Sequence, residues 1–302
     1  MSEVVLFFGR AANRLLANKD RDQLIFRLPG AFARAGLVVL LIALPSLMLP
    51  GDTMDGRQVV TLVAIFAALF TIVEYSAASP SIIEFRDAPP FNRVRFCALF
   101  AIVLSLTLIL RGYRQPSSFT DIFVQSGADI GFSLNFPFSP VNQVMAIAPV
   151  GTNSEVLNAI QGTAGLAYVI SLLSIMWFVI LLRLQHWPRR SGTFNVWVNL
   201  PTFDPTSGGD VVLRLKRDAR INVFLGLLLP FLIPAIVNLI ALLGAPVALD
   251  DPQTLIWTIA TWAFLPAAIV MRGIALNRVA KMIKQQRRKA YDKASSDGYL
   301  PA

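Results

Sequence analysis

The stretch that decides the fold is VVTLVAIFAALFTIVEYSAA, residues 59–78, in which Glu74 is the single charged residue among twenty. A helix rises about 1.5 Å per residue, so about 20 apolar residues cross a hydrocarbon core about 30 Å thick. Lipid offers no hydrogen-bond partner to an unpaired backbone group, so such a run satisfies its own backbone as a helix. Residues 59–78 are therefore predicted to span a membrane.

The rest of the chain repeats this pattern. The 302 residues are 55% hydrophobic and 15% charged, with a mean hydropathy of +0.60, which is more apolar than an average soluble domain. Five further apolar runs occupy residues 35–49, 96–110, 164–182, 221–243 and 255–271. These runs predict an all-α polytopic integral membrane protein with six transmembrane helices.

The segments between these runs divide the chain further. We expect an amphipathic N-terminal segment, an outer loop or cap of about 50 residues after the third helix, and a cytoplasmic β-hairpin between the fourth and fifth helices. A basic tail is expected to continue the last helix to about Ser295. The predicted boundaries are 1–34 for the N-terminal segment, 35–110 for helices 1–3, 111–162 for the outer loop, 163–183 for helix 4, 184–220 for the hairpin loop, 221–272 for helices 5 and 6, and 273–302 for the tail.

Lysine and arginine gather on one predicted side of the membrane. Of the 27 basic residues, 24 belong to that side, and only Arg57, Arg111 and Arg114 belong to the other. Positive residues are retained on the cytoplasmic side, so both termini are predicted to be cytoplasmic. This pattern is typical of a bacterial inner-membrane protein. No cleavable signal peptide is expected at the N-terminus, because no small-residue cleavage pattern follows the first apolar patch.

The outer loop has an unusual apolar content for a connection of its length, which indicates a small folded cap. A short helix is expected near residues 142–148, and another at 154–160 should lead into the fourth span. Thr152, Asn153 and Ser154 are helix-capping residue types at that point. The segment GADIG (127–131) has the G-x-x-x-G spacing of a helix-dimerisation motif, but its place in the polar outer loop argues against that role.

The loop between the fourth and fifth spans contains two alternating segments, TFNVWVNL (193–200) and DVVLRLKR (210–217). Alternation with a period of two is typical of strands, and PTFDPTSGG between the segments supplies a turn. An isolated hairpin is marginal in water, so its apolar face needs a cover: the membrane surface, the N-terminal segment or another chain. The candidate docking surface consists of Phe194, Val196, Trp197, Val198, Val211, Leu213 and Leu215.

Two polar residues inside the predicted spans are candidates for transport or ligand binding. Intramembrane carboxylates are often functional, but Glu74 lies near a helix end, where its side chain can also reach the interface. Asn238 follows Pro230 and Pro234, each of which removes a backbone donor from the helix. The bent segment could line a transport path, or it could be a packing bend with an interhelical hydrogen bond.

Candidates for chemistry are few. His186 is the single histidine, so it could supply one axial ligand to a pigment or haem, or lie at the interface beside Trp187. A three-ligand metal centre is not expected, and the lone Cys97 argues against a cysteine-rich metal site. No G-x-S-x-G, H-E-x-x-H or P-loop motif is present. No catalytic residue is therefore named, and bound lipids are the one kind of non-protein component expected.

Three functions remain open. The first is a non-catalytic membrane subunit, a scaffold or accessory component, with other membrane protein subunits and anionic lipid head groups as partners. The second is a transporter or channel that uses the proline-broken fifth helix, although no row of polar residues crosses the predicted spans. The third is a membrane enzyme acting on a lipid-linked substrate. A nucleic-acid role is not expected, because topology alone accounts for the basic residues.

Overall fold

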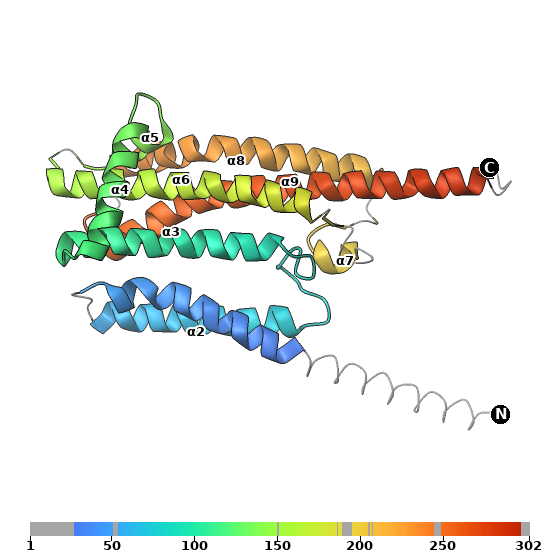
Figure 1. Ribbon diagram of the computed structural model, residues 1–302, viewed down its shortest axis with the longest axis horizontal. Coiled ribbons are helices and arrows are strands. Elements are labelled where there is room, and N and C mark those ends of the chain that lie inside the picture. The colour runs from blue at the N-terminus through green and yellow to red at the C-terminus, as the bar shows by residue number, and fades with distance from the viewer. Residues whose placement is uncertain are drawn as a thin grey trace, which may run out of the picture. The chain divides into compact units, whose positions relative to one another are not determined.

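The structure is a computed structural model, and it describes residues 27–50, 54–149, 151–185, 187–188, 195–204, 206, 208–244 and 249–296 (Figure 1). Over these ranges the chain is helical and contains no strand. Six of its helices are long and apolar enough to cross a membrane. The predicted all-α class is confirmed over these ranges, with six helices that are candidates to span a membrane.

The six long helices overlap the six predicted runs and extend most of them. They are the first helix (Arg27–Met48), α2 (Met54–Ser76), α3 (Phe91–Arg114), α6 (Ser154–Leu184), α8 (Val211–Leu242) and α9 (Pro252–Ser296). Polar and basic flanks continue the helical backbone beyond the apolar window, and α9 carries the basic tail as far as Ser296. Three shorter helices are α4 (Ser118–Leu134), α5 (Pro140–Met145) and α7 (Val196–Asn199).

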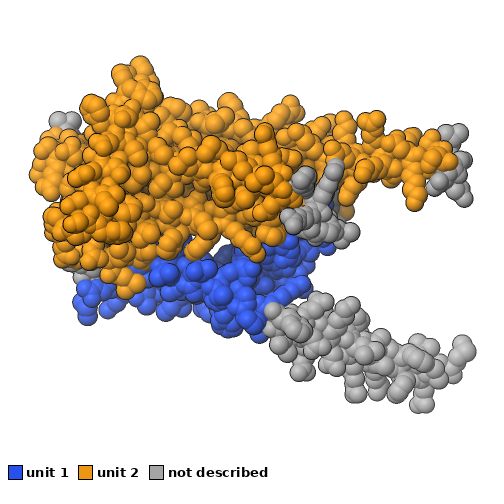
Figure 2. All heavy atoms as spheres, viewed as in Figure 1, with its two compact units in different colours: residues 1–43, 53–87, 195–204 blue, residues 44–52, 88–194, 205–302 orange. Residues whose placement is uncertain are grey.

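The chain divides into two compact units, coloured separately in Figure 2. Unit 1 comprises residues 1–43, 53–87 and 195–204, and unit 2 comprises residues 44–52, 88–194 and 205–302. In its described part, unit 1 contains most of the first helix, α2, the loop that follows α2, and α7. Residues 1–26 of the predicted N-terminal segment lie outside the described residues, and residues 27–34 belong to the first helix.

Unit 2 is a helical bundle of α3, α6, α8 and α9, whose chain directions alternate along the sequence (Figure 1). α4 runs across α3 and α6 at the end of the bundle where α3 finishes and α6 begins. The bundle core consists of large apolar side chains with almost no exposed surface. They include Phe91, Ile102, Leu106, Ile109, Ile160, Phe178, Leu182, Leu215, Ile256 and Ile259.

Helix starts in unit 2 follow the side-chain chemistry of their first residues. The Asn153 side chain accepts from the Glu155 amide at the start of α6, as its residue type predicted. Asp210 accepts from the Val212 amide at the start of α8, and Asp251 accepts from the Thr254 amide at the start of α9. These side chains satisfy backbone donors that have no partner within the helix.

The predicted outer loop contains more helix than expected. α5 overlaps the short helix expected near residues 142–148, but α4 was not predicted. Ser117 and Thr120 form a reciprocal capping box at the start of α4. The placement of GADIG in a loop was wrong: Gly127 and Gly131 lie on α4, and a Cβ added to Gly131 would lie 2.5 Å from the Gln161 carbonyl oxygen of α6. The motif therefore allows two helix backbones of the same chain to pack closely.

The predicted β-hairpin is wrong over the described residues. Residues 196–199 form α7, and Val211 begins α8. Val212, Leu215 and Ala219 are buried at helical spacing, whereas Leu213 is 65% exposed, so the predicted apolar face is split between two sides of a helix. An alternation of a few residues suits both conformations. The Asp210 cap and the apolar run beyond residue 220 favour the helix, since they let it propagate.

Candidate functional site

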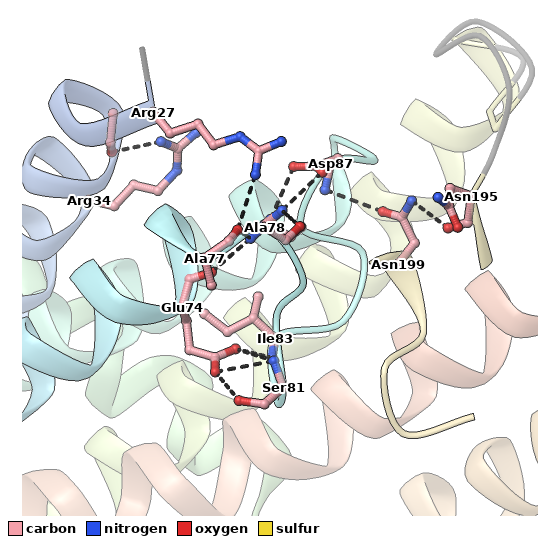
Figure 3. Close-up of polar contacts among 12 residues, drawn as sticks. Arg27, Arg34, Glu74, Ala77, Ala78, Ser81, Ile83, Asp87, Asn195 and Asn199 are labelled. Carbon is pink, nitrogen blue, oxygen red and sulfur yellow. Dashed lines mark hydrogen bonds and ion pairs between the residues drawn. The ribbon is translucent and has the colours of Figure 1, made fainter. Parts of the chain in front are cut away.

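The richest polar cluster of the described residues surrounds Glu74 at the end of α2, within unit 1 (Figure 3). Glu74 is 3% exposed. Its carboxylate accepts from the backbone amides of Ser81 (3.1 and 3.2 Å), Ile82 (3.0 Å) and Ile83 (3.1 Å), and from the Ser81 hydroxyl. α2 ends two residues after Glu74, and the loop turns back so that its N–H groups converge on the carboxylate. A buried carboxylate needs several donors of this kind.

Arg86 makes the complementary interaction at the same helix end. Its Nη1 donates to the carbonyls of Glu74 (2.9 Å) and Ala77 (2.7 Å), and its Nη2 donates to the carbonyl of Ala78 (3.3 Å). The final carbonyls of a helix lack intrahelical partners and carry a partial negative charge. The Arg86 side chain, 2% exposed, also pairs with Asp87 at 3.2 Å. Arg86 therefore caps α2, and it does so without access to solvent.

The start of the first helix reaches the same place. Arg27 Nη1 donates to the carbonyl of Ala77 at 3.1 Å, and the Arg34 guanidinium lies 4.7 Å from the centre of the Tyr75 ring. A guanidinium over an aromatic face is attracted by the ring quadrupole. These contacts join the first helix and α2 at one end of unit 1.

α7 closes the cluster from a distant part of the sequence. The Phe85 amide donates to the Asn199 carbonyl at 2.7 Å, and the Asp87 amide donates to Asn199 Oδ1 at 3.3 Å. The Thr202 hydroxyl donates to Glu84 Oε1 at 2.7 Å. Leu200 is fully buried beside these contacts. The end of the first alternating segment, 193–200, was expected to pack against the membrane, the N-terminal segment or another chain. It lies instead against the loop 84–87 of its own chain.

The chemistry of this cluster is that of a structural junction. Both Glu74 oxygens accept hydrogen bonds, and the Arg86 guanidinium donates to three carbonyls and to Asp87. A carboxylate that relays protons needs to exchange with water or substrate. This geometry fits a group that holds the turn after α2, while the transport role of Glu74 stays a prediction.

In unit 2, Pro234 of α8 leaves one helix carbonyl without its backbone donor, and a side chain of α9 supplies the missing hydrogen bond. Pro234 has no N–H to donate to the Pro230 carbonyl four residues earlier. The indole Nε1 of Trp262 on α9 donates to that carbonyl at 2.9 Å. The Trp262 ring also stacks on Tyr168 of α6, with 5.8 Å between ring centres. Pro230 and Pro234 are buried, so the proline break is a packing contact between helices.

Asn238 lies one turn beyond Pro234. Its side chain is half-buried and makes no hydrogen bond with any residue that the structure describes. Asn238 and both prolines belong to unit 2, whereas Glu74 belongs to unit 1. Asn238 is thus the one transport candidate whose polar group is not already used within the described chain.

The other predicted site residues are placed as follows. His186 and Phe194 lie outside the described residues, and so does the side chain of Trp197. Val196 and Val198 are half-buried in α7, and Val211 is half-buried at the start of α8. Within the described ranges, no three His, Cys, Asp or Glu side chains come close enough together to hold a metal ion.

Several residues that build these sites were not singled out from the sequence. Ser81 and Arg86 lie in a proline-bounded loop, where a buried arginine had no visible partner. Asn199 is separated from Asp87 by 112 residues, and Trp262 from Pro230 by 32. Of these contacts, only the one at the Pro230 carbonyl has a local sequence signal. Pro234, four residues later, has no N–H, which predicts that this carbonyl needs another donor.

Comparison of this chain with protein-family models, with curated proteins and with solved structures gave no match. Similarity to characterised proteins therefore assigns no function to it.

Proposed function

We propose that this chain is a non-catalytic subunit, a scaffold or accessory component, of a larger membrane protein assembly in a bacterial inner membrane. Both termini lie in the cytoplasm in this proposal, because 24 of the 27 lysines and arginines belong to that side. Its partners are other membrane protein subunits and the lipids around them.

One observation carries the proposal: Glu74 and three buried or half-buried threonine hydroxyls in the described spans bond within the chain itself. Glu74 binds the turn after α2, and the hydroxyls of Thr71, Thr107 and Thr163 donate to carbonyls of their own helices at 2.7, 2.7 and 2.6 Å. A reacting or conducting group needs to remain available to its substrate. Polar groups that bond within the chain in this way are not available to a substrate, whereas the apolar helix surfaces remain available to other helices.

The outward apolar surface of α2 supports the same role. Nine large apolar side chains on this helix are at least 45% exposed: Met54, Val59, Leu62, Val63, Ile65, Phe66, Leu69, Phe70 and Val73. In a bilayer this surface meets lipid tails or another helix. Helix association in membranes depends on such surfaces through packing.

The test is extraction from the native membrane into nanodiscs, followed by native mass spectrometry. We expect a defined complex with a second membrane protein, and a photo-crosslinking residue in place of Phe66 should label it. The same residue in place of Tyr291, which is exposed near the end of α9, is the control for random collision. Recovery only as a monomer or homo-oligomer contradicts the proposal.

A transporter is the second candidate, and Asn238 is the observation that favours it. An amide without a described partner beside a proline-broken segment resembles the sites that transporters build from interrupted helices. In proteoliposomes, Asn238→Ala should abolish flux of protons measured with an internal pH-sensitive dye. Asn222→Ala is the control and should leave the flux unchanged, because the Asn222 side chain is already bonded to the Asp218 carbonyl and to Arg272. If the unmodified protein carries no proton flux, proton transport is excluded as its function.

A further inference from the structure

A groove with a volume of about 810 Å³ runs between α8 and α9, within unit 2. Its floor is formed by small residues, because Gly273 lies against the Ala219 carbonyl oxygen and the Val223 backbone, where a Cβ would be 2.7 and 3.0 Å away. Larger side chains that recur every three or four residues on the two antiparallel helices form the walls. The volume is in the range of sites that hold small ligands.

The groove is basic toward one end. Lys216 and Arg220 line it from α8, and Arg278 and Lys281 line it from α9. None of these four cations forms an ion pair with a described residue. The carboxylates of the same region are engaged elsewhere: Asp218 pairs with Arg217 at 3.4 Å, and Asp210 pairs with Arg287 at 2.6 Å.

The groove is apolar toward the other end. Val223, Leu227 and Ile274 line it there, and Phe224 stands beside them. Phe224 and Leu227 are 65% and 64% exposed, so they offer their surface to whatever occupies the groove. The groove thus has four positive charges at one end and an apolar channel at the other. This arrangement matches a molecule with an anionic head and a hydrocarbon tail.

We propose that this groove is a specific binding site for one anionic phospholipid. The phosphate lies among the four cations, and an acyl chain lies along Val223, Leu227 and Ile274. Charge complementarity selects the head group, and burial of the acyl methylene groups adds to the free energy of binding. The site does not depend on the subunit role proposed above, since it requires only that α8 and α9 lie in a membrane.

The test uses the full-length protein in nanodiscs that contain equal amounts of phosphatidylglycerol and phosphatidylcholine. Native mass spectrometry counts the lipids that remain bound after the disc is released. We expect one retained phosphatidylglycerol, favoured over phosphatidylcholine by about tenfold or more, because the four cations attract its net negative charge. Equal retention of the two lipids overturns the proposal.

Two variants separate the head-group contacts from the apolar ones. Arg220→Gln with Arg278→Gln should lower the preference for phosphatidylglycerol to near unity, while Ile274→Trp should reduce retention by filling the apolar channel. The control is Arg288→Gln with Lys289→Gln, which removes the same charge from an exposed part of α9. An equal loss in the control means that net charge, rather than the groove, attracts the lipid, and it overturns the proposal.

A photoactivatable acyl chain on phosphatidylglycerol identifies the occupant directly. We expect its label on peptides that contain Val223 or Ile274. Labelling elsewhere, or a crosslink through the groove to a second copy of the chain, contradicts the assignment. Thermal unfolding of each variant in the same nanodiscs shows that a loss of lipid is not a loss of fold.

Discussion

Glu74 and Arg86 bond to opposite kinds of backbone group in the same turn after α2: Glu74 accepts from amides, and Arg86 donates to carbonyls. The carboxylate of Glu74 gathers the N–H groups of the loop after α2, and the guanidinium of Arg86 gathers the carbonyls at the end of α2. Each charged group is buried and each is fully bonded, which is the condition under which a buried charge stabilises a fold. The turn is therefore held by side chains and not by hydrogen bonds between its own backbone groups alone.

The substitution Glu74→Gln tests this account. The amide has one acceptor oxygen and no charge, so hydrogen bonds to loop amides are lost, and we expect the free energy of unfolding to fall by about 2–3 kcal/mol. Asp129→Asn, at an exposed carboxylate on α4, should change it by less than about 0.5 kcal/mol. Thermal unfolding in detergent measures both variants. Equal stability of the two would contradict a structural role for Glu74.

Asp210 makes the start of α8 sensitive to pH. The hydrogen bond from Arg287, with that from the Val212 amide, holds the pKa of the Asp210 carboxyl below its usual range. A carboxyl whose pKa is lower in the folded state stabilises the fold above its unfolded pKa, and this contribution is lost as the pH falls through the folded pKa. The gap in unfolding temperature between the protein and Asp210→Asn should narrow as pH is lowered from about 6 toward 3. A gap that stays constant over this range would rule out the linkage.

At the scale of elements, close backbone approach depends on glycine. Gly131 of α4 and Gly165 of α6 face each other, and a Cβ added to Gly165 would lie 2.5 Å from the Gly131 Cα. Backbone atoms cannot move aside as the end of a flexible side chain can. The packing of α4 on α6 therefore has no room for a methyl group at either position.

Gly131→Ala should thus destabilise unit 2, by about 1–3 kcal/mol, because the extra methyl group overpacks the contact. Gly36→Ala is the matched control, since a Cβ at that helical position meets nothing within 4 Å. The free energy of unfolding in detergent distinguishes them. A tolerated alanine at Gly131 falsifies the described approach of the two helices.

The break in α8 can be tested by coupling two substitutions. Trp262→Phe removes the donor to the Pro230 carbonyl and should cost about 1 kcal/mol. Pro234→Ala supplies a backbone N–H that can bond to the same carbonyl, so the cost of Trp262→Phe should be smaller in that background. A double-mutant cycle of unfolding free energies measures the difference. Purely additive effects would show that the two donors do not share the carbonyl.

The elements also show where sequence reasoning succeeds. Six spans could be predicted because the length and polarity of a run are local properties. The alternating segment 210–217 was misinterpreted as a strand because a few residues do not distinguish a period of 2 from one of 3.6. α4 was missed because its glycines and polar residues resemble a loop until a neighbouring helix is there to pack against them.

At the scale of the whole molecule, basic residues set the expected orientation. The connection between α3 and α4 should lie outside the cytoplasm, and the basic end of α9 should lie inside it. In a Cys97→Ser background, Gln115→Cys should react with a membrane-impermeant maleimide in intact cells, whereas Lys289→Cys should react only after permeabilisation. Both positions are exposed. Reaction of Lys289→Cys in intact cells would contradict the predicted orientation, because it would place the basic end of α9 outside the cytoplasm.

The sequence by itself determined the all-helical class with six candidate spans, because the length and polarity of each hydrophobic run are local properties of that run. Tertiary structure alone decided which groups meet: Arg86 with the end of α2, Asn199 with the loop 84–87, and Trp262 with the Pro230 carbonyl. It also decided that Lys216, Arg220, Arg278 and Lys281 line one groove. These contacts join residues that are distant in sequence, and hydrogen bonding and packing select them only when the helices come together.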